Sequence, residues 1–196
     1  MQPVQAESVS YKAFQLFNKY IVCNSSQGIL IIDQQRAHER ILYEHYLRSN
    51  SQTPLATQQI LFPEQIELSA KDFTLMESLL PEFKLLGFDL EVFGKNSFVI
   101  NGSPTELENV NIVHTIENIL ESYKLNTIDA RLDIHDNLCR SMAKSTAIRS
   151  GKALDDSEIQ LIIEHLMQCE SPSFTADGRT IFMSIEKENI DRHFKK

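Results

Sequence analysis

Residues 13–48 read AFQLFNKYIVCNSSQGILIIDQQRAHERILYEHYLR, and they carry the strongest structural pattern in the chain. Apolar residues alternate over 14–22, which predicts a strand. Turn-forming residues at 25–28 precede the apolar run 29–32, which is typical of a strand covered on both faces. Asp33 is then placed to cap a helix over most of the remaining residues. The stretch predicts a strand-turn-strand-helix unit.

The rest of the chain mixes helical and strand-like segments without an internal repeat. Start and stop signals mark most of them: Ser69 and Asp155 are placed to cap helices, and Gly94 lies in the turn of a hairpin. The predicted elements are strand-like residues over 60–68, a helix after Ser69, a hairpin over 88–100, helices from Thr105, over 128–150 and from Asp155, and a strand over 180–185 before a charged tail.

These elements predict the α+β class, with strands at both ends of the chain and a self-contained middle. The simplest packing pairs the terminal strands and inserts the middle as a subdomain. We therefore expect a polar terminus over 1–10, one lobe from 11–57 together with 128–196, and an inserted lobe over 58–127.

Composition limits the classes of function. The 196 residues carry a formal net charge of −8, so no whole-molecule field would draw the domain to phosphates. The three cysteines, Cys23, Cys139 and Cys169, form no C-x-x-C pair and are predicted to be buried thiols in a reducing compartment. No run approaches the roughly 20 apolar residues that a membrane span needs, so we expect a soluble intracellular protein.

Five segments together resemble the C-terminal domain of the MutL family of DNA mismatch-repair proteins. Residues 16–22 (LFNKYIV), 28–34 (GILIIDQ) and 37–44 (AHERILYE) resemble its opening. Residues 147–151 (AIRSG) and 177–179 (DGR) follow in the family's order, so that the resemblance covers nearly the whole chain.

The resemblance implies a two-lobed domain in which the lobe from the chain's two ends forms a homodimer and the inserted lobe is regulatory. It also implies the mismatch-recognition protein MutS and the DNA polymerase sliding clamp as partners, in the bacterial cytoplasm or nucleoid. An ATPase domain that uses ATP and Mg²⁺ would precede this region in the full-length protein, which would also make most of the contacts with DNA. We expect no cofactor and no membrane contact in this domain.

Nuclease-competent members of the family carry DQHA-x-x-E-x-x-x-x-E, an A-C-(K/R/H) segment and a CPHGRP loop, which together bind metal. Asp33, Glu39 and Glu44 match the first motif, but other ligand positions are altered. The altered positions are Gln35 for histidine, Lys144 for cysteine, and Thr175 and Asp177 in the loop for cysteine and histidine. We therefore expect a degenerate endonuclease site and a non-catalytic domain.

Two readings of the surviving residues stay open. Asp33, Glu39 and Asp177 form an all-oxygen set that suits Mg²⁺ or Mn²⁺ better than Zn²⁺, and a divergent metal-dependent endonuclease is the alternative function. The competing hypothesis is that Arg36 and Lys144 supply fixed positive charge in place of the ion, because a cation in the metal's position repels the metal. We favour charge replacement, with Arg40 and Glu44 as an ordinary i, i+4 pair.

Residues 58–63 (QQILFP) fit the Q-x-x-(L/I)-x-P pattern by which family members dock on the sliding clamp. Leu61 would enter an apolar pocket, Pro63 would limit flexibility and Gln58 would bond at the rim. In the alternative reading, Ile60 and the following phenylalanine are core residues of a strand. Core packing explains the apolar residues but does not explain Gln58, so we favour docking.

A local basic concentration follows in the helical run. Arg140, Lys144, Arg149 and Lys152 would contact DNA phosphates, or would form an ordinary solvated helix face, which the acidic total favours. No P-loop, dinucleotide fingerprint or G-x-S-x-G elbow occurs, so kinase, dehydrogenase and hydrolase functions lack support.

Overall fold

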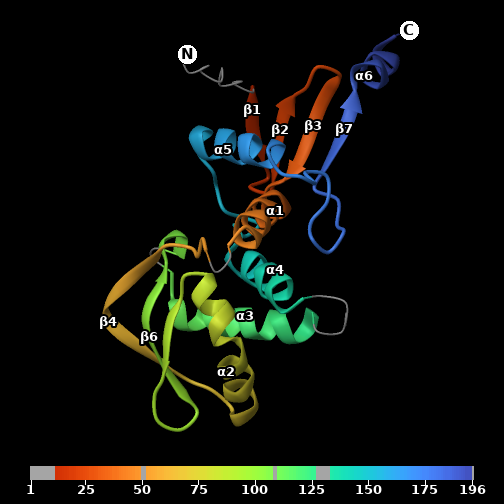
Figure 1. Ribbon diagram of the computed structural model, residues 1–196. Helices are drawn as coiled ribbons and strands as arrows, with labels where there is room; N and C mark the ends of the chain where they lie inside the picture. The colour runs from red at the N-terminus through yellow and green to blue at the C-terminus, as the bar shows by residue number, and fades with distance from the viewer. Residues whose placement is uncertain (1–11, 50–51, 108–109, 127–132, 196) are drawn as a thin grey trace, which may run out of the picture. The chain divides into compact units, whose positions relative to one another are not determined.

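Contacts within the chain group it into two compact units, Met1–Ile41 with Ile148–Lys196, and Leu42–Ala147. Each unit combines helices with an antiparallel sheet, so the predicted α+β class is confirmed. The lobes expected from the sequence divide at 57/58 and 127/128, and their dimerising and regulatory roles stay predictions. Figure 1 shows the computed structural model, which describes residues 12–49, 52–107, 110–126 and 133–195.

The first unit contains a four-stranded antiparallel sheet in the order β1-β2-β3-β7. Ile31 of β3 lies opposite Met183 of β7, so strands from the two ends of the chain pair directly, as predicted. The strands are β1 (Ala13–Leu16), β2 (Tyr20–Asn24), β3 (Gly28–Asp33) and β7 (Phe182–Glu186).

The stretch 14–22 forms two strands, where the sequence predicted one. A tight turn interrupts it, because Phe17 and Asn18 both have positive φ, at 57° and 48°. Lys19 N donates to Leu16 O across this turn at 3.2 Å. Asn tolerates the left-handed region, but phenylalanine enters it rarely, so the usual glycine signal for such a turn is missing here.

One face of this sheet carries the core of the first unit. Helix α5 (Asp156–Met167) lies across it in Figure 1, and the first turns of α1 (Gln34–Leu47) close the cluster. The helix cap predicted at Asp155 is present, and Glu158 completes it as a capping box. The charged tail forms a short helix, α6 (Lys187–Phe194). The buried members of the core are Ile21, Cys23, Ile32, Ala37, Ile159, Ile162, Ile163, Leu166 and Ile181.

The second unit holds a three-stranded sheet in the order β4-β6-β5, with helices around it. Ser69 caps α2 as predicted, since its side chain accepts a hydrogen bond from Asp72 N. The strands are β4 (Thr57–Glu67), β5 (Asp89–Val92) and β6 (Ser97–Pro104), and the helical elements are α2 (Ala70–Leu85), η1 (Thr105–Leu107), α3 (Ile112–Asn126) and α4 (Ile134–Thr146).

Two helix boundaries differ from the predictions. Thr105 begins only the short turn η1, and Asn111 caps α3 by accepting from His114 N at 2.8 Å. The run predicted over 128–150 is helical only from Ile134 to Thr146, and its residues 128–132 lie outside the described part of the chain.

Cys23 and Cys139 are buried free thiols, as predicted, whereas Cys169 is partly exposed. Across the described residues, none of the helices has the length and apolar character needed to cross a membrane.

Candidate functional site

The loop over 174–180 is held in one shape by its own hydrogen bonds. Thr175 N donates to Arg179 O and Gly178 N donates to Thr175 O, both at 2.9 Å. The Thr175 hydroxyl accepts from Arg179 N at 3.0 Å and donates to Asp177. Gly178 has φ of +83°, which glycine adopts without strain. The loop therefore fixes the directions in which Asp177 and Arg179 project.

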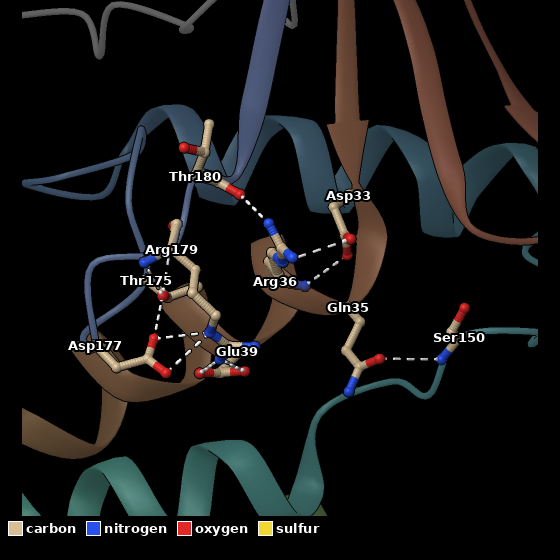
Figure 2. A network of polar contacts seen from close by, with 9 residues as sticks. All are labelled: Asp33, Gln35, Arg36, Glu39, Ser150, Thr175, Asp177, Arg179 and Thr180. Atoms are coloured by element: carbon tan, nitrogen blue, oxygen red, sulfur yellow. Dashed lines mark hydrogen bonds and ion pairs between the residues drawn. The ribbon is translucent and has the colours of Figure 1, made fainter.

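Arg179 joins this loop to the first helix. Its Nη2 donates to both carboxylate oxygens of Glu39, at 2.7 and 3.0 Å, and its Nε lies 3.0 and 2.9 Å from the two oxygens of Asp177 (Figure 2). The Glu39 side chain is only 8% exposed, so its charge is removed from most solvent and needs a partner. One guanidinium therefore serves two carboxylates.

A second arginine occupies the start of the same helix. Asp33 caps α1, as predicted, by accepting from Arg36 N at 3.1 Å. The guanidinium of Arg36 lies 3.6 Å from the Asp33 carboxylate and donates from Nη1 to Thr180 O at 2.7 Å (Figure 2). Arg36 therefore neutralises Asp33 and also ties α1 to the chain that leads into β7.

Hydrogen bonds within the cluster favour the ionised form of Asp177 and the charged form of Arg179. Burial acts to raise the pKa of Asp177, but hydrogen bonds from Thr175 and Arg179 outweigh it, and the pKa falls below its ordinary value. Burial acts to lower the pKa of Arg179, but Asp177 and Glu39 raise it overall. No group of three or more His, Cys, Asp or Glu side chains in the described residues is arranged to hold a metal ion. At the motif positions that would supply histidine and cysteine, this unit carries Gln35, Thr175 and Asp177, so these positions do not fit a thiolate or imidazole metal site.

Helix α1 also anchors the segment that follows residue 147. His38 Nδ1 accepts from Ile148 N at 3.0 Å, and Gln35 Oε1 accepts from Ser150 N at 3.3 Å (Figure 2 shows the second bond). The buried Gln34 donates from Nε2 to Lys152 O at 3.0 Å. Burial, with the nearby Lys152 and a second histidine, lowers the pKa of His38 to about 4, so His38 is neutral at pH 7.

The clamp-like segment lies in β4, at an edge of the three-stranded sheet. Gln59 pairs with Gly102 and Glu64 pairs with Ile100, so four residues of β4 stand opposite Asn101 alone. Within this bulge Leu61 is 84% exposed and Phe62 is 80% exposed. Gln58 and Pro63 are exposed as well. The core reading therefore fails for the phenylalanine, and only Ile60 is half-buried.

Comparison with known proteins identifies the family. The model of the MutL C-terminal dimerisation domain matches residues 13–154. The chain belongs to the MutL family. It is 36% identical over 191 residues, 95% of its length, to the DNA mismatch repair protein MutL of Parabacteroides distasonis. The MutL proteins of Bacteroides fragilis and Chlorobium chlorochromatii are 32% and 31% identical over 92% and 97% of the chain. The chain spans about 30% of the length of these relatives.

The two units divide the residues of the MutL nuclease motifs. Asp33, Glu39 and Asp177 belong to the first unit, whereas Glu44 belongs to the second, where its carboxylate lies 3.9 Å from Arg48. Lys144 is exposed on α4 in the second unit. Its part in charge replacement therefore stays a prediction, as does the pairing of Arg40 with Glu44.

Sequence reasoning missed the arginine that contacts Glu39 in this MutL domain. Arg179 belongs to the DGR segment, which is one of the segments that resemble the MutL family. It lies 140 residues from Glu39 in the sequence. The sequence did hold one signal: Arg179 follows Gly178 and lies two residues after Asp177. This spacing lets a loop arginine fold back onto the Asp177 carboxylate. It gives no information about Glu39.

The four basic residues predicted to touch DNA are also divided between the units. In the second unit, Arg140 donates from Nε and Nη2 to Asp136 at 3.0 Å and lies over the ring of Tyr43. In the first, Lys152 pairs with Glu158 at 3.0 Å, and Arg149 is exposed. Carboxylate partners on two of the four cations favour the solvated-face reading, and DNA contact stays a prediction.

Proposed function

We propose that this domain is the homodimerising scaffold of a MutL-type mismatch-repair protein and does not itself cut DNA. The observation that carries the proposal is the pair of arginines on the surviving carboxylates: Arg179 on Glu39 and Asp177, and Arg36 on Asp33. A guanidinium that pairs with a carboxylate, at 2.7–3.0 Å for Arg179 and 3.6 Å for Arg36, fills the place that a cation would take and repels a divalent ion. In this proposal, the carboxylates of Asp33, Glu39 and Asp177 stabilise the fold through their arginine partners.

The dimer contact is proposed to be the face of the four-stranded sheet opposite the core. One row across all four strands is wholly apolar and ends at its two edges in Phe14 and Met183, which are 57% and 56% exposed. Between them, Val22 and Ile31 on the central strands are only half-buried. Because the domain family dimerises, a second copy is the occupant that an apolar sheet face of this kind fits.

Ile31→Asp tests this face, because it places a charge at the centre of the proposed contact and leaves the core face untouched. Sedimentation equilibrium is expected to give a dimer for the wild type and a monomer with unchanged far-UV circular dichroism for Ile31→Asp. The matched control is Leu161→Asp, on the exposed side of α5, which is expected to stay dimeric. A dimeric Ile31→Asp would move the contact elsewhere.

In the whole protein, we propose that the dimer couples mismatch recognition by MutS to downstream factors and docks on the DNA polymerase sliding clamp. Gln58, Leu61 and Pro63 would contact the clamp, which their exposure in β4 supports. ATP and Mg²⁺ would act in another domain, and most DNA contacts would come from the full-length protein. The bacterial relatives favour a location in the cytoplasm or nucleoid.

The alternative function is a divergent metal-dependent endonuclease. One observation favours it, because the carboxylates of Asp33, Glu39 and Asp177 all lie within one compact unit. It requires Mn²⁺ or Zn²⁺ to displace two arginines. Mn²⁺-dependent nicking of DNA that disappears in Asp33→Asn would separate this function from the scaffold.

A further inference from the structure

Three side chains of the second unit form a row of a thiol, an imidazole and a carboxylate. His135 and Cys139 lie four residues apart on α4, and therefore on one face of that helix, while Glu82 comes from α2. His135 Nε2 is 3.5 Å from Cys139 Sγ, and His135 Nδ1 is 2.8 Å from Glu82 Oε2. The imidazole therefore stands between the thiol and the carboxylate.

The carboxylate determines which ring nitrogen is available to a ligand. A carboxylate only accepts hydrogen bonds, so Glu82 holds the hydrogen on Nδ1, and the neutral ring turns the lone pair of Nε2 toward the sulfur. Carboxylates orient metal-ligating histidines in the same way. The side chains of His135 and Glu82 are 17% and 25% exposed, whereas Cys139 is fully buried. Solvent therefore reaches the row from the imidazole end.

The sulfur and Nε2 are close enough to share one metal ion. With bonds of about 2.3 Å to a thiolate and about 2.0 Å to an imidazole, one ion can contact both atoms up to a separation of about 4.3 Å. The observed 3.5 Å lies within that limit. Among the described side chains, no third His, Cys, Asp or Glu completes a metal-binding group. The ion must therefore be one that two protein donors satisfy, which points to soft monovalent ions such as Cu⁺.

The charges around Cys139 favour a cation beside its sulfur. Burial raises the pKa of the Cys139 thiol to about 12, and the negative charges of Asp136, Glu82 and Asp133 act in the same direction. These carboxylates repel a thiolate, and for the same reason they attract a positive ion. A monovalent ion on the thiolate also leaves the buried end of the row without net charge, which lowers the cost of burial.

We propose that Cys139 and His135 bind one soft monovalent metal ion of the Cu⁺ class, and that Glu82 is the positioning residue for the imidazole. On binding, the S–H bond of Cys139 breaks and its proton leaves to solvent. Bonds form from Sγ and from Nε2 to the ion, whose oxidation state does not change. None of the three residues lies in the nuclease motifs, so this site is separate from the one described above.

Competition for Cu⁺ between this chain and a chromogenic Cu⁺ chelator tests the proposal, without oxygen and with ascorbate as the reductant. The wild type is expected to take one tightly held ion from the chelator, and Cys139→Ser is expected to take none. His135→Gln should weaken binding at least about 10-fold, and Glu82→Gln about 10- to 100-fold with the stoichiometry unchanged. Because one proton is released, the wild-type affinity should rise about tenfold for each pH unit.

Cys169→Ser is the matched control, because His165 and Cys169 have the same spacing in sequence but the Cys169 thiol donates to the backbone oxygen of His165. It is expected to keep the tightly held ion. Equal Cu⁺ affinity in the wild type and in Cys139→Ser would overturn the proposal, as would a loss of the ion in Cys169→Ser. Far-UV circular dichroism checks the fold of each variant, and His135→Gln with wild-type affinity would overturn the proposal even if Cys139→Ser did not fold.

Discussion

At the residue scale, the site depends on one arginine serving a carboxylate that water barely reaches. Glu39 is 8% exposed and receives two hydrogen bonds from Arg179. Removing the partner of a buried carboxylate destabilises a protein by far more than an exposed ion pair stabilises it. The free-energy cost of removing the carboxylate from water is then no longer offset. The stability of this corner of the molecule therefore depends on Arg179.

We expect Arg179→Met to lower the free energy of unfolding by roughly 2 kcal/mol, less than the roughly 3–5 kcal/mol of a fully buried pair because Arg179 is 39% exposed. Adding Glu39→Gln should recover part of the loss, with a coupling of about 1 kcal/mol between the two changes. Urea denaturation of the single and double variants measures this. A loss below about 0.5 kcal/mol for Arg179→Met would contradict the account.

Asp33 and Arg179 differ in how far their contacts could be predicted from the neighbouring sequence. Asp33 was predicted as a helix cap because capping is decided within three residues, and the bond to Arg36 N is present. Arg179 was missed because its contact with Glu39 joins segments 140 residues apart, which no local pattern records.

At the scale of elements, helix α1 determines where the chain turns after α4. The backbone N–H groups of Ile148 and Ser150 donate to His38 and Gln35, so they are lost to any continuation of the helix. The sequence predicted helix as far as 150 because nothing local opposed it. The helices begun by Ser69 and Asp155 were predicted correctly, since both depend on caps within one turn.

The neutral state of His38 makes this junction sensitive to acid. Its pKa is about 4 in the fold and 6.5 when unfolded, so the unfolded chain takes up a proton first as pH falls. Protonation of His38 therefore leaves the free energy of unfolding unchanged above pH 6.5 and lowers it progressively as the pH falls toward 4. Between pH 7 and 5 the loss is expected to be about 2 kcal/mol, at about 1.4 kcal/mol for each pH unit below 6.5.

His38→Asn tests this, because the asparagine oxygen can accept from Ile148 N without titrating. Urea denaturation at pH 7 and pH 5 should show a smaller pH-dependent loss for His38→Asn than for wild type. The exposed His193 supplies the control, and His193→Asn should keep the wild-type pH dependence. Equal losses in wild type and His38→Asn would show that His38 does not act as described.

At the scale of the whole molecule, α+β was predictable because strands occur at both ends of the chain and pair as β3 with β7. The bulge in β4 was not predictable, since Ile60, Leu61 and Phe62 fit a buried strand by composition alone. Only the pairing of Gln59 and Glu64 with nearly adjacent residues of β6 shows that the chain between them leaves the ladder. Exposure therefore separates the docking reading from the core reading.

We propose that Arg179 and Arg36 take the place of the metal in the family's nuclease site. Incubating this chain with supercoiled plasmid, Mn²⁺ and the sliding clamp tests it most directly, with a nuclease-competent MutL domain as the positive control and Asp33→Asn beside the wild type. The account predicts no nicking by either protein at concentrations where the positive control converts all the plasmid. Nicking by the wild type that disappears in Asp33→Asn would contradict it.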